Sequence, residues 1–195
     1  MINKSLIFVI SFFIFCNSAF ANTFIFKTKN IEISKEKNQI LAGKGKVFSS
    51  DNDLEINADK FEYLKDQNLL KSNGNGEALI KSKNLVIKFD NAIFNQNELT
   101  IEAIGNIKIN HTDKKFFILT EKIFYDQSNS LINSNSKTIL KDSFGNTYGV
   151  DNFKFEIDKS LLKVVNLESK DKNNNIVKTK LAYINTKSGK LFGKD

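Results

Sequence analysis

The stretch INADKFEYLKDQNLL, residues 56–70, has a pattern of residue types that returns three more times along the chain. Each copy has an acidic residue at a corner, alternating apolar residues, a polar tip and a leucine. The other copies are KFDNAIFNQNELT (88–100), LTEKIFYDQSNSLI (119–132) and VDNFKFEIDKSLL (150–162). The closing leucines are spaced by 30, 32, 30 and 30 residues: Leu69, Leu99, Leu131, Leu161 and Leu191. A period of this size predicts a stacked, quasi-repetitive architecture.

Inside each copy the apolar residues alternate with polar ones. In the first copy the pair Asp59-Lys60 separates two alternating runs, and the parity shifts by one residue between them. Period two is typical of strands with one buried face. A parity shift at the same polar pair in each copy indicates a corner or bulge that keeps the apolar set facing inward. The Asn-Gly-rich segment SNGNGE (72–77) is expected to form a turn.

No helical period stands out after residue 22, and the chain contains no proline. The sequence therefore predicts an all-β protein of many short strands, in one domain over residues 22–195. Each copy supplies two strand segments and cannot close a barrel by itself. Stacked copies with opposed apolar faces form a long two-sheeted groove or jelly roll. Its first strand, expected at 23–33, and its last, expected at 175–184, have no partner within the chain.

Residues 1–21 have the layout of a secretory signal peptide. A lysine in MINKS is followed by the apolar run LIFVISFFIFC and by Ala19-Phe20-Ala21, which is an A-x-A cleavage signal. The apolar run is shorter than the roughly 20 residues of a spanning helix, which favours a cleaved signal peptide. An uncleaved anchor is the alternative. Cys16 is the only cysteine, so disulfides cannot stabilise the mature chain. The export signal indicates a location outside the cytoplasm.

The net charge of +7 comes with 29 basic residues, all of them lysine. A surface that reads phosphates or bases normally uses arginine, whose planar fork makes bidentate contacts. Lys, Asn, Ile and Phe are abundant together, as an A/T-biased coding sequence produces. We therefore expect no nucleic-acid partner.

No catalytic constellation, metal site or cofactor motif is found. His111 is the only histidine and is expected in a solvated turn, which makes a zinc site improbable. Carboxylates recur once per corner, one repeat apart, so they are expected to cap backbone N–H groups rather than to form a catalytic pair: Asp59, Asp90, Glu121 and Asp151. The glycines of 43–45 and 74–76 precede no helix and are expected to be turn glycines.

The run ILAGKGKV…LEINADKFEYLKDQNLL (40–70) resembles the repeat of the OstA-like family of lipopolysaccharide-transport proteins. This family comprises the periplasmic bridge protein LptA, the anchored LptC and the N-terminal domain of the outer-membrane protein LptD. The matching positions are Ile40, Ala42, Gly45, Val47, Leu54, Ile56, Ala58, Asp59 and Tyr63. The resemblance implies a V-shaped β-jellyroll of about five two-strand repeats that holds lipid A acyl chains between its sheets. Such modules join edge to edge into a bridge between the inner and outer membranes.

On this basis we expect a non-enzymatic periplasmic transport module without cofactor. Its partners are lipopolysaccharide, other OstA-like Lpt proteins through edge-strand pairing, and further copies of itself. The expected lipid-contacting residues are the inward alternating ones: Val47, Leu54, Ile56, Phe61, Leu85, Ile87, Phe89, Ile107, Ile118 and Ile123. Two alternatives remain: an exported structural or adhesive β-solenoid without ligand, and an LptC-like protein anchored in the inner membrane. The sequence does not separate an LptA-like protein from the periplasmic part of an LptD-like one.

Overall fold

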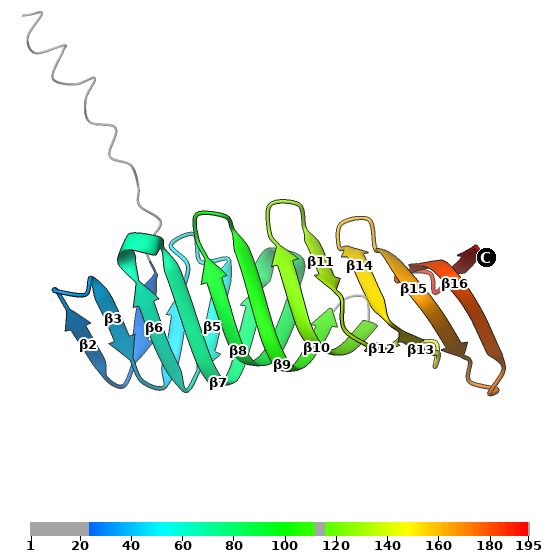
Figure 1. Cartoon of the computed structure of the whole chain (residues 1–195), viewed down its shortest axis with the longest axis horizontal. Coiled ribbons are helices and arrows are strands. Elements are labelled where there is room, and N and C mark those ends of the chain that lie inside the picture. The colour runs from blue at the N-terminus through cyan, green and yellow to red at the C-terminus, as the bar shows by residue number, and fades with distance from the viewer. Residues whose placement is uncertain (1–23, 112–115, 195) are drawn as a thin grey trace, which may run out of the picture.

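The computed structural model describes residues 24–111 and 116–194, and the predicted signal peptide lies outside them. These residues form one antiparallel sheet of 17 strands, with two short 3-10 turns, η1 (Lys65–Gln67) and η2 (Lys81–Lys83), and no α-helix. The strands follow one another from the N-terminal to the C-terminal end of an elongated molecule (Figure 1). The all-β prediction is confirmed.

The sheet is folded lengthwise into two halves that face each other. Six long strands run through both halves: β7 (Leu69–Ile80), β8 (Leu85–Asn95), β9 (Thr100–His111), β10 (Phe116–Asp126), β15 (Leu161–Lys170) and β16 (Ile176–Asn185). Half I contains the first parts of β7, β9 and β15 and the second parts of β8, β10 and β16. Its short strands are β2 (Ile31–Ser34), β3 (Gln39–Ala42), β6 (Lys60–Leu64), β11 (Leu131–Ser134), β14 (Asn152–Glu156) and β17 (Leu191–Lys194). Half II contains β1 (Ile25–Thr28), β4 (Gly45–Phe48), β5 (Leu54–Ala58), the remaining parts of β7 to β10, β12 (Thr138–Lys141), β13 (Thr147–Val150) and the remaining parts of β15 and β16.

The crease between the halves lies where the sequence shifts its parity. The register shifts in β8 between Lys88 and Asn91, and in β10 between Thr120 and Lys122. The register also shifts in β7 between Asn73 and Gly76, whereas at Asp59 the crease separates two strands, β5 and β6. Because the shift restores the inward direction, apolar residues are buried on both sides of each bend. The predicted corners are therefore present.

Side-chain hydrogen bonds join three of the corners to the neighbouring strand along the crease. The side-chain amide of an asparagine donates to each corner carboxylate over 2.6 to 2.8 Å: Asn75 to Asp59, Asn106 to Asp90, and Asn166 to Asp151. The sequence had predicted backbone N–H groups as the partners of these carboxylates. The corner at Glu121 is built differently, because Thr120, Ser134 and Thr138 form a chain of buried hydroxyl groups beside it.

The segment SNGNGE (72–77) was predicted to be a turn, and this prediction is wrong: the segment is the bend inside β7. Gly74 has a φ of +78°, which a side chain rarely adopts. A Cβ at Gly76 would overlap the ring of Phe89 from β8. This glycine therefore provides the space in which an aromatic ring fills the crease.

The reversing turns of half I share a residue with positive φ. Its φ lies between 45° and 54° at Asn38, Asn68, Leu99, Ser130 and Ser160. The backbone carbonyl of each accepts a hydrogen bond from the following turn, as Leu99 does from the N–H of Gln127 over 3.0 Å. The period between these residues is 30, 31, 31 and 30. Leu99 is thus the turn residue itself, and Thr100 rather than Leu99 corresponds to Leu69, which corrects the alignment of the closing leucines.

Both ends of the sheet have an edge without a partner strand among the described residues. The segment expected as one first strand is divided into β1 and β2, which lie on different halves. The expected last strand, 175–184, is not the last, because β17 pairs with the second part of β16. The C-terminal edge therefore consists of β17 in half I and the first part of β16 in half II.

Candidate functional site

The ten residues predicted to contact lipid all point into the space between the two halves. Each is between 0% and 6% exposed, and all belong to one apolar cluster that extends from Ala42 to Ala182 and Ile184. Eight of the ten lie on half II, and only Phe61 and Ile123 lie on half I. The predicted inward direction is confirmed by the burial, whereas contact with lipid stays a prediction.

The ten predicted residues leave out most of the wall of half I. That wall includes Tyr63, Leu70, Phe94, Ile101, Tyr125, Ile132 and Phe155, all buried. They also leave out the C-terminal third of the cluster, from Leu140 to Ile184. The signal that could have found both is the same alternation, which continues through β6, β14 and β15.

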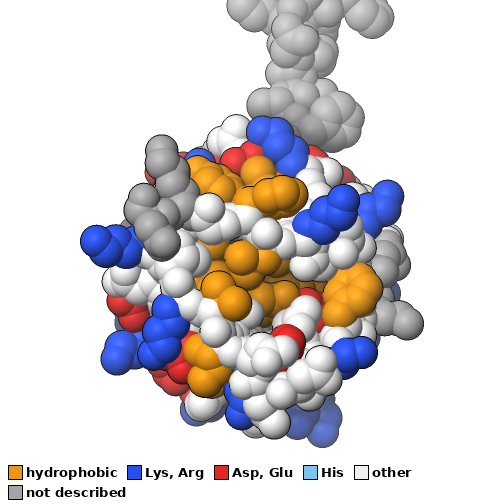
Figure 2. All heavy atoms as spheres, turned by 90° about the vertical axis from the view of Figure 1, so that its right-hand side faces the viewer, with side chains coloured by type: hydrophobic (Ala, Val, Ile, Leu, Met, Phe, Trp, Pro, Cys, Tyr) orange, Lys and Arg blue, Asp and Glu red, His pale blue; other side chains and the backbone are white. Residues whose placement is uncertain are grey.

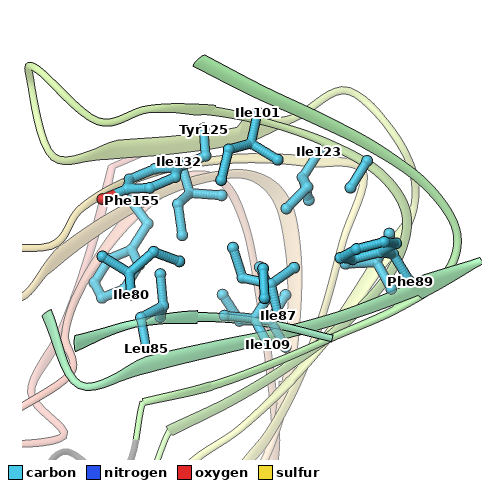
Figure 3. Close-up of a cluster of buried hydrophobic side chains, with 14 of the residues drawn as sticks. Ile80, Leu85, Ile87, Phe89, Ile101, Ile109, Ile123, Tyr125, Ile132 and Phe155 are labelled. Carbon is cyan, nitrogen blue, oxygen red and sulfur yellow. The ribbon is translucent and has the colours of Figure 1, made fainter. Parts of the chain in front are cut away.

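Figure 3 shows how the two walls meet. Ile101, Ile123 and Ile132 face Ile80, Leu85, Ile87 and Ile109 across the interior, and Phe89 lies where the two walls converge. The walls diverge away from Phe89, so the cross-section is V-shaped, as the family resemblance implies.

Side chains fill this interior. Ile56, Ile87 and Ile123 are 0% exposed, and so are many of the residues opposite them. Protein interiors are close-packed, so a chain of methylene groups finds room here only if the halves move apart. Burial of this kind stabilises the fold by about 25 cal/mol per Å² of apolar surface, which opposes that movement.

The margin opposite the crease is here called the mouth. There the turns of half I, such as 96–99, 127–130 and 157–160, approach turns of half II such as 49–53 and 81–84. Lys83 Nζ and Asp158 Oδ1 form an ion pair across the mouth at 2.7 Å. Gln127 Nε2 donates to Asp53 Oδ2 over 3.5 Å, which is at the limit of a hydrogen bond. Polar contacts between turns therefore hold the mouth closed.

The hydroxyl of Tyr125 lies at the mouth end of the interior. Its ring is fully buried, and its oxygen points away from Phe89 (Figure 3). Burial raises the pKa of this phenol well above its ordinary value, and the nearby carboxylates of Asp53 and Asp158 raise it further. No described residue forms a hydrogen bond with this hydroxyl. The phenol is therefore a neutral donor held close to two mouth carboxylates.

A small cavity of about 40 Å³ opens at the mouth beside the turn 96–99. Its apolar walls are Phe24, Leu54, Phe94, Leu99 and Ile101, and its polar rim includes Ser49, Asp51, Gln96 and Gln127. Leu54, Phe94 and Ile101 are also members of the core cluster. The cavity is therefore a place where the core reaches the surface.

The C-terminal end of the molecule has an apolar centre. Figure 2 shows hydrophobic side chains in the middle of this end, surrounded by polar and charged ones. Phe192 of β17 and Ile176 and Val177 of β16 are more than half exposed on the same end. At the N-terminal end, Ile25, Ile31 and Ile33 on β1 and β2 are exposed to about the same extent.

Titratable groups offer little chemistry. No group of three or more His, Cys, Asp or Glu that could hold a metal ion is found over 24–111 and 116–194. The prediction that His111 lies in a solvated turn is wrong. This side chain is 5% exposed at the end of β9, because it continues the inward parity of Ile107 and Ile109.

The fold and its interior define a class of protein: a folded antiparallel sheet that encloses one continuous apolar layer and, over the described residues, has a free strand edge at each end. Residues 46–161 match the family described as OstA-like protein, so the chain belongs to the OstA-like family. This family is linked to lipopolysaccharide transport, is periplasmic in general, and consists of transport or binding modules that interact with lipopolysaccharide and other Lpt proteins. A comparison with curated proteins finds no match. In the part of the chain that the structure describes, no helix is both long and apolar enough to span a membrane.

Proposed function

We propose that this protein is a periplasmic lipopolysaccharide-transport module that shields lipid A acyl chains between the two halves of its sheet. It forms part of a bridge between the inner and outer membranes and serves outer-membrane assembly. The observation that carries the proposal is the single apolar layer, which runs through the whole stack and reaches the surface at the C-terminal end (Figure 2). A core that only stabilises the fold does not need to reach the surface at one end. Exposed apolar surface of this kind favours association with another molecule.

The packed interior supports a second candidate function. An exported structural β-solenoid without ligand needs only a filled core, and the ten predicted lipid contacts are filled core positions. The two functions differ in one measurable way. Organic extraction of the purified mature protein, followed by mass spectrometry, yields lipid A if the transport proposal holds and no lipid if the solenoid proposal holds.

A photo-crosslinker tests which side of a strand meets the lipid. Ile87 points inward and is 0% exposed, whereas its neighbour Lys88 is exposed and paired with Glu77 on the outer face over 3.1 Å. We expect a crosslinker at Ile87 to capture lipid A and one at Lys88 to capture none. The pair Ile56 and Glu55 provides a second test on β5. Equal capture on both faces would exclude binding between the halves.

The two edges are the proposed contacts with other OstA-like modules, by strand addition. Ile31 of β2 and Ile176 of β16 lie on these edges. Gly43 donates to the carbonyl of Asn30, and Asp171 to that of Asn175, so antiparallel alternation turns the N–H groups of Ile31 and Ile176 outward. Proline at either position removes an outward donor without breaking an internal bond.

Head-to-tail pairing of these edges does not close, so it gives chains of increasing length rather than a symmetric dimer. Sedimentation over a range of concentrations should show a ladder of species that collapses in Ile31→Pro or Ile176→Pro. A monomer at all concentrations that also binds no other OstA-like protein of its own organism would refute the edge proposal.

The position of the protein in the transport system depends on the N-terminal segment. We propose cleavage after Ala21, which gives a free periplasmic module. N-terminal sequencing of protein from the periplasmic fraction should begin at Asn22. A chain that begins at Met1 and requires detergent for extraction would instead support the LptC-like alternative.

A further inference from the structure

Leu99 is an anomaly among the turn residues. Eleven described non-glycine residues have positive φ, and ten of them are asparagine or serine. Short polar side chains tolerate this left-handed conformation because they can form local hydrogen bonds, whereas larger side chains are strained in it. Leu99 adopts it with a φ of 53°.

The side chain of Leu99 is also exposed. It is 41% exposed, although the residues next to the cavity it borders, Phe94 and Ile101, are buried. Neither the backbone strain nor the exposure stabilises the turn, and the four equivalent turns use asparagine or serine. Strain kept at one position is a reason to look for a function there.

The surroundings of Leu99 are suited to a thin apolar ligand. It forms part of the wall of the 40 Å³ mouth cavity, whose inner residues belong to the core. This volume accommodates roughly three water molecules, so it admits the end of a methylene chain but not a ring or a peptide segment. Gln96 Oε1, on the rim, is buried and has no hydrogen-bond partner among the described residues.

We propose that this cavity is the entry point through which one acyl chain of an amphiphile passes into the interior, and that Leu99 is its first apolar contact. This inference rests on the proposed function. The chain end enters between Leu99 and Leu54, and the polar head stays at the rim, where Asp51, Gln96 and Gln127 lie. The adjacent contact between Gln127 and Asp53 is long, so the mouth separates there more readily than at the 2.7 Å pair of Lys83 and Asp158.

The test uses a substitution that separates stability from binding. Leu99→Asn places at this turn the residue found at the equivalent turns, Asn38 and Asn68. Relief of the strain should raise Tm by about 2–4 °C. Loss of the apolar contact should slow the loading of lipid A by at least fivefold. Stopped-flow fluorescence with fluorophore-labelled lipid A measures this rate. Ile93→Asn removes an equally exposed apolar side chain, 41% exposed on the outer face of β8, and we expect it to load at the wild-type rate.

A second probe, fluorophore-labelled myristate, distinguishes the source of the chain. Loading of both probes slowed by Leu99→Asn indicates that the site reads the acyl chain itself, whereas an effect on lipid A alone assigns Leu99 to the headgroup region and overturns the proposal. Unchanged loading of both probes in a Leu99→Asn protein with raised Tm also overturns it, while the proposed function stands. Wild-type protein that loads neither probe refutes the proposed function, and this inference with it.

Discussion

The crease gives the sharpest test of how the two halves are joined. Gly76 has an ordinary φ, so alanine is conformationally acceptable there, but its Cβ would overlap the Phe89 ring. Phe89 is 3% exposed between the converging walls and lies at 6.1 Å from Phe94, measured between ring centroids. The ring has little room to move, so the added methyl group overpacks the core. We expect Gly76→Ala to destabilise the protein by about 1–3 kcal/mol.

The magnitude is best measured as a coupling. Phe89→Ala alone should cost about 3–5 kcal/mol, because it removes a buried aromatic ring. In that background the overlap no longer exists, so Gly76→Ala should cost little. The double mutant should therefore be more stable than the sum of the single changes by about 1–3 kcal/mol. Urea unfolding followed by circular dichroism measures all four proteins on one scale.

Gly149 provides the matched control. A Cβ there would approach only Glu168 O, at 3.8 Å, which is ordinary contact. Gly149→Ala should leave stability unchanged or raise it by about 0.4–1 kcal/mol through the unfolded chain. A Gly76→Ala protein as stable as Gly149→Ala, or a cost that persists without the Phe89 ring, would refute the crease packing described above.

Three further predictions follow from burial. Tyr125→Phe removes a buried hydroxyl that no described residue bonds, so unfolding experiments should find it as stable as the wild type or up to about 1 kcal/mol more stable; a clear loss would contradict this. Burial raises the pKa of Tyr125 and Tyr148 above the ordinary value near 10. The two phenols therefore contribute fully to the free energy of unfolding below about pH 10, and this contribution is lost as pH rises towards the folded-state pKa, because only the unfolded chain ionises there. Stability measured from pH 8 to 11 should therefore decline above pH 10, less steeply in Tyr125→Phe, and an unchanged slope would exclude this phenol as a cause. Ile87→Ala should cost about 2–5 kcal/mol and Lys88→Ala under about 0.5 kcal/mol, a contrast that disappears if the alternation is misassigned.

Features that depend on neighbouring residues can be predicted from the sequence. Alternation fixed the direction of side chains such as Ile56 and Ile87, because successive strand residues point to opposite faces. The parity shift at Asp90 located a bend, since only a bend keeps both flanking runs inward. The repeat of about 30 residues indicated the stack and the OstA-like family.

Features that depend on residues one repeat or more apart become visible only in the folded protein. The conformation of Leu99 follows from a ladder of turns whose carbonyls meet the N–H groups of the next turn, and a leucine carries no local signal for positive φ. The burial of His111 follows from its place at the end of a long strand, although its polar neighbours in the sequence indicate a turn. The mouth, with the Lys83–Asp158 pair between residues 75 positions apart, exists only when the two halves face each other. Alternation assigns each side chain a face, but it does not say which face lies opposite.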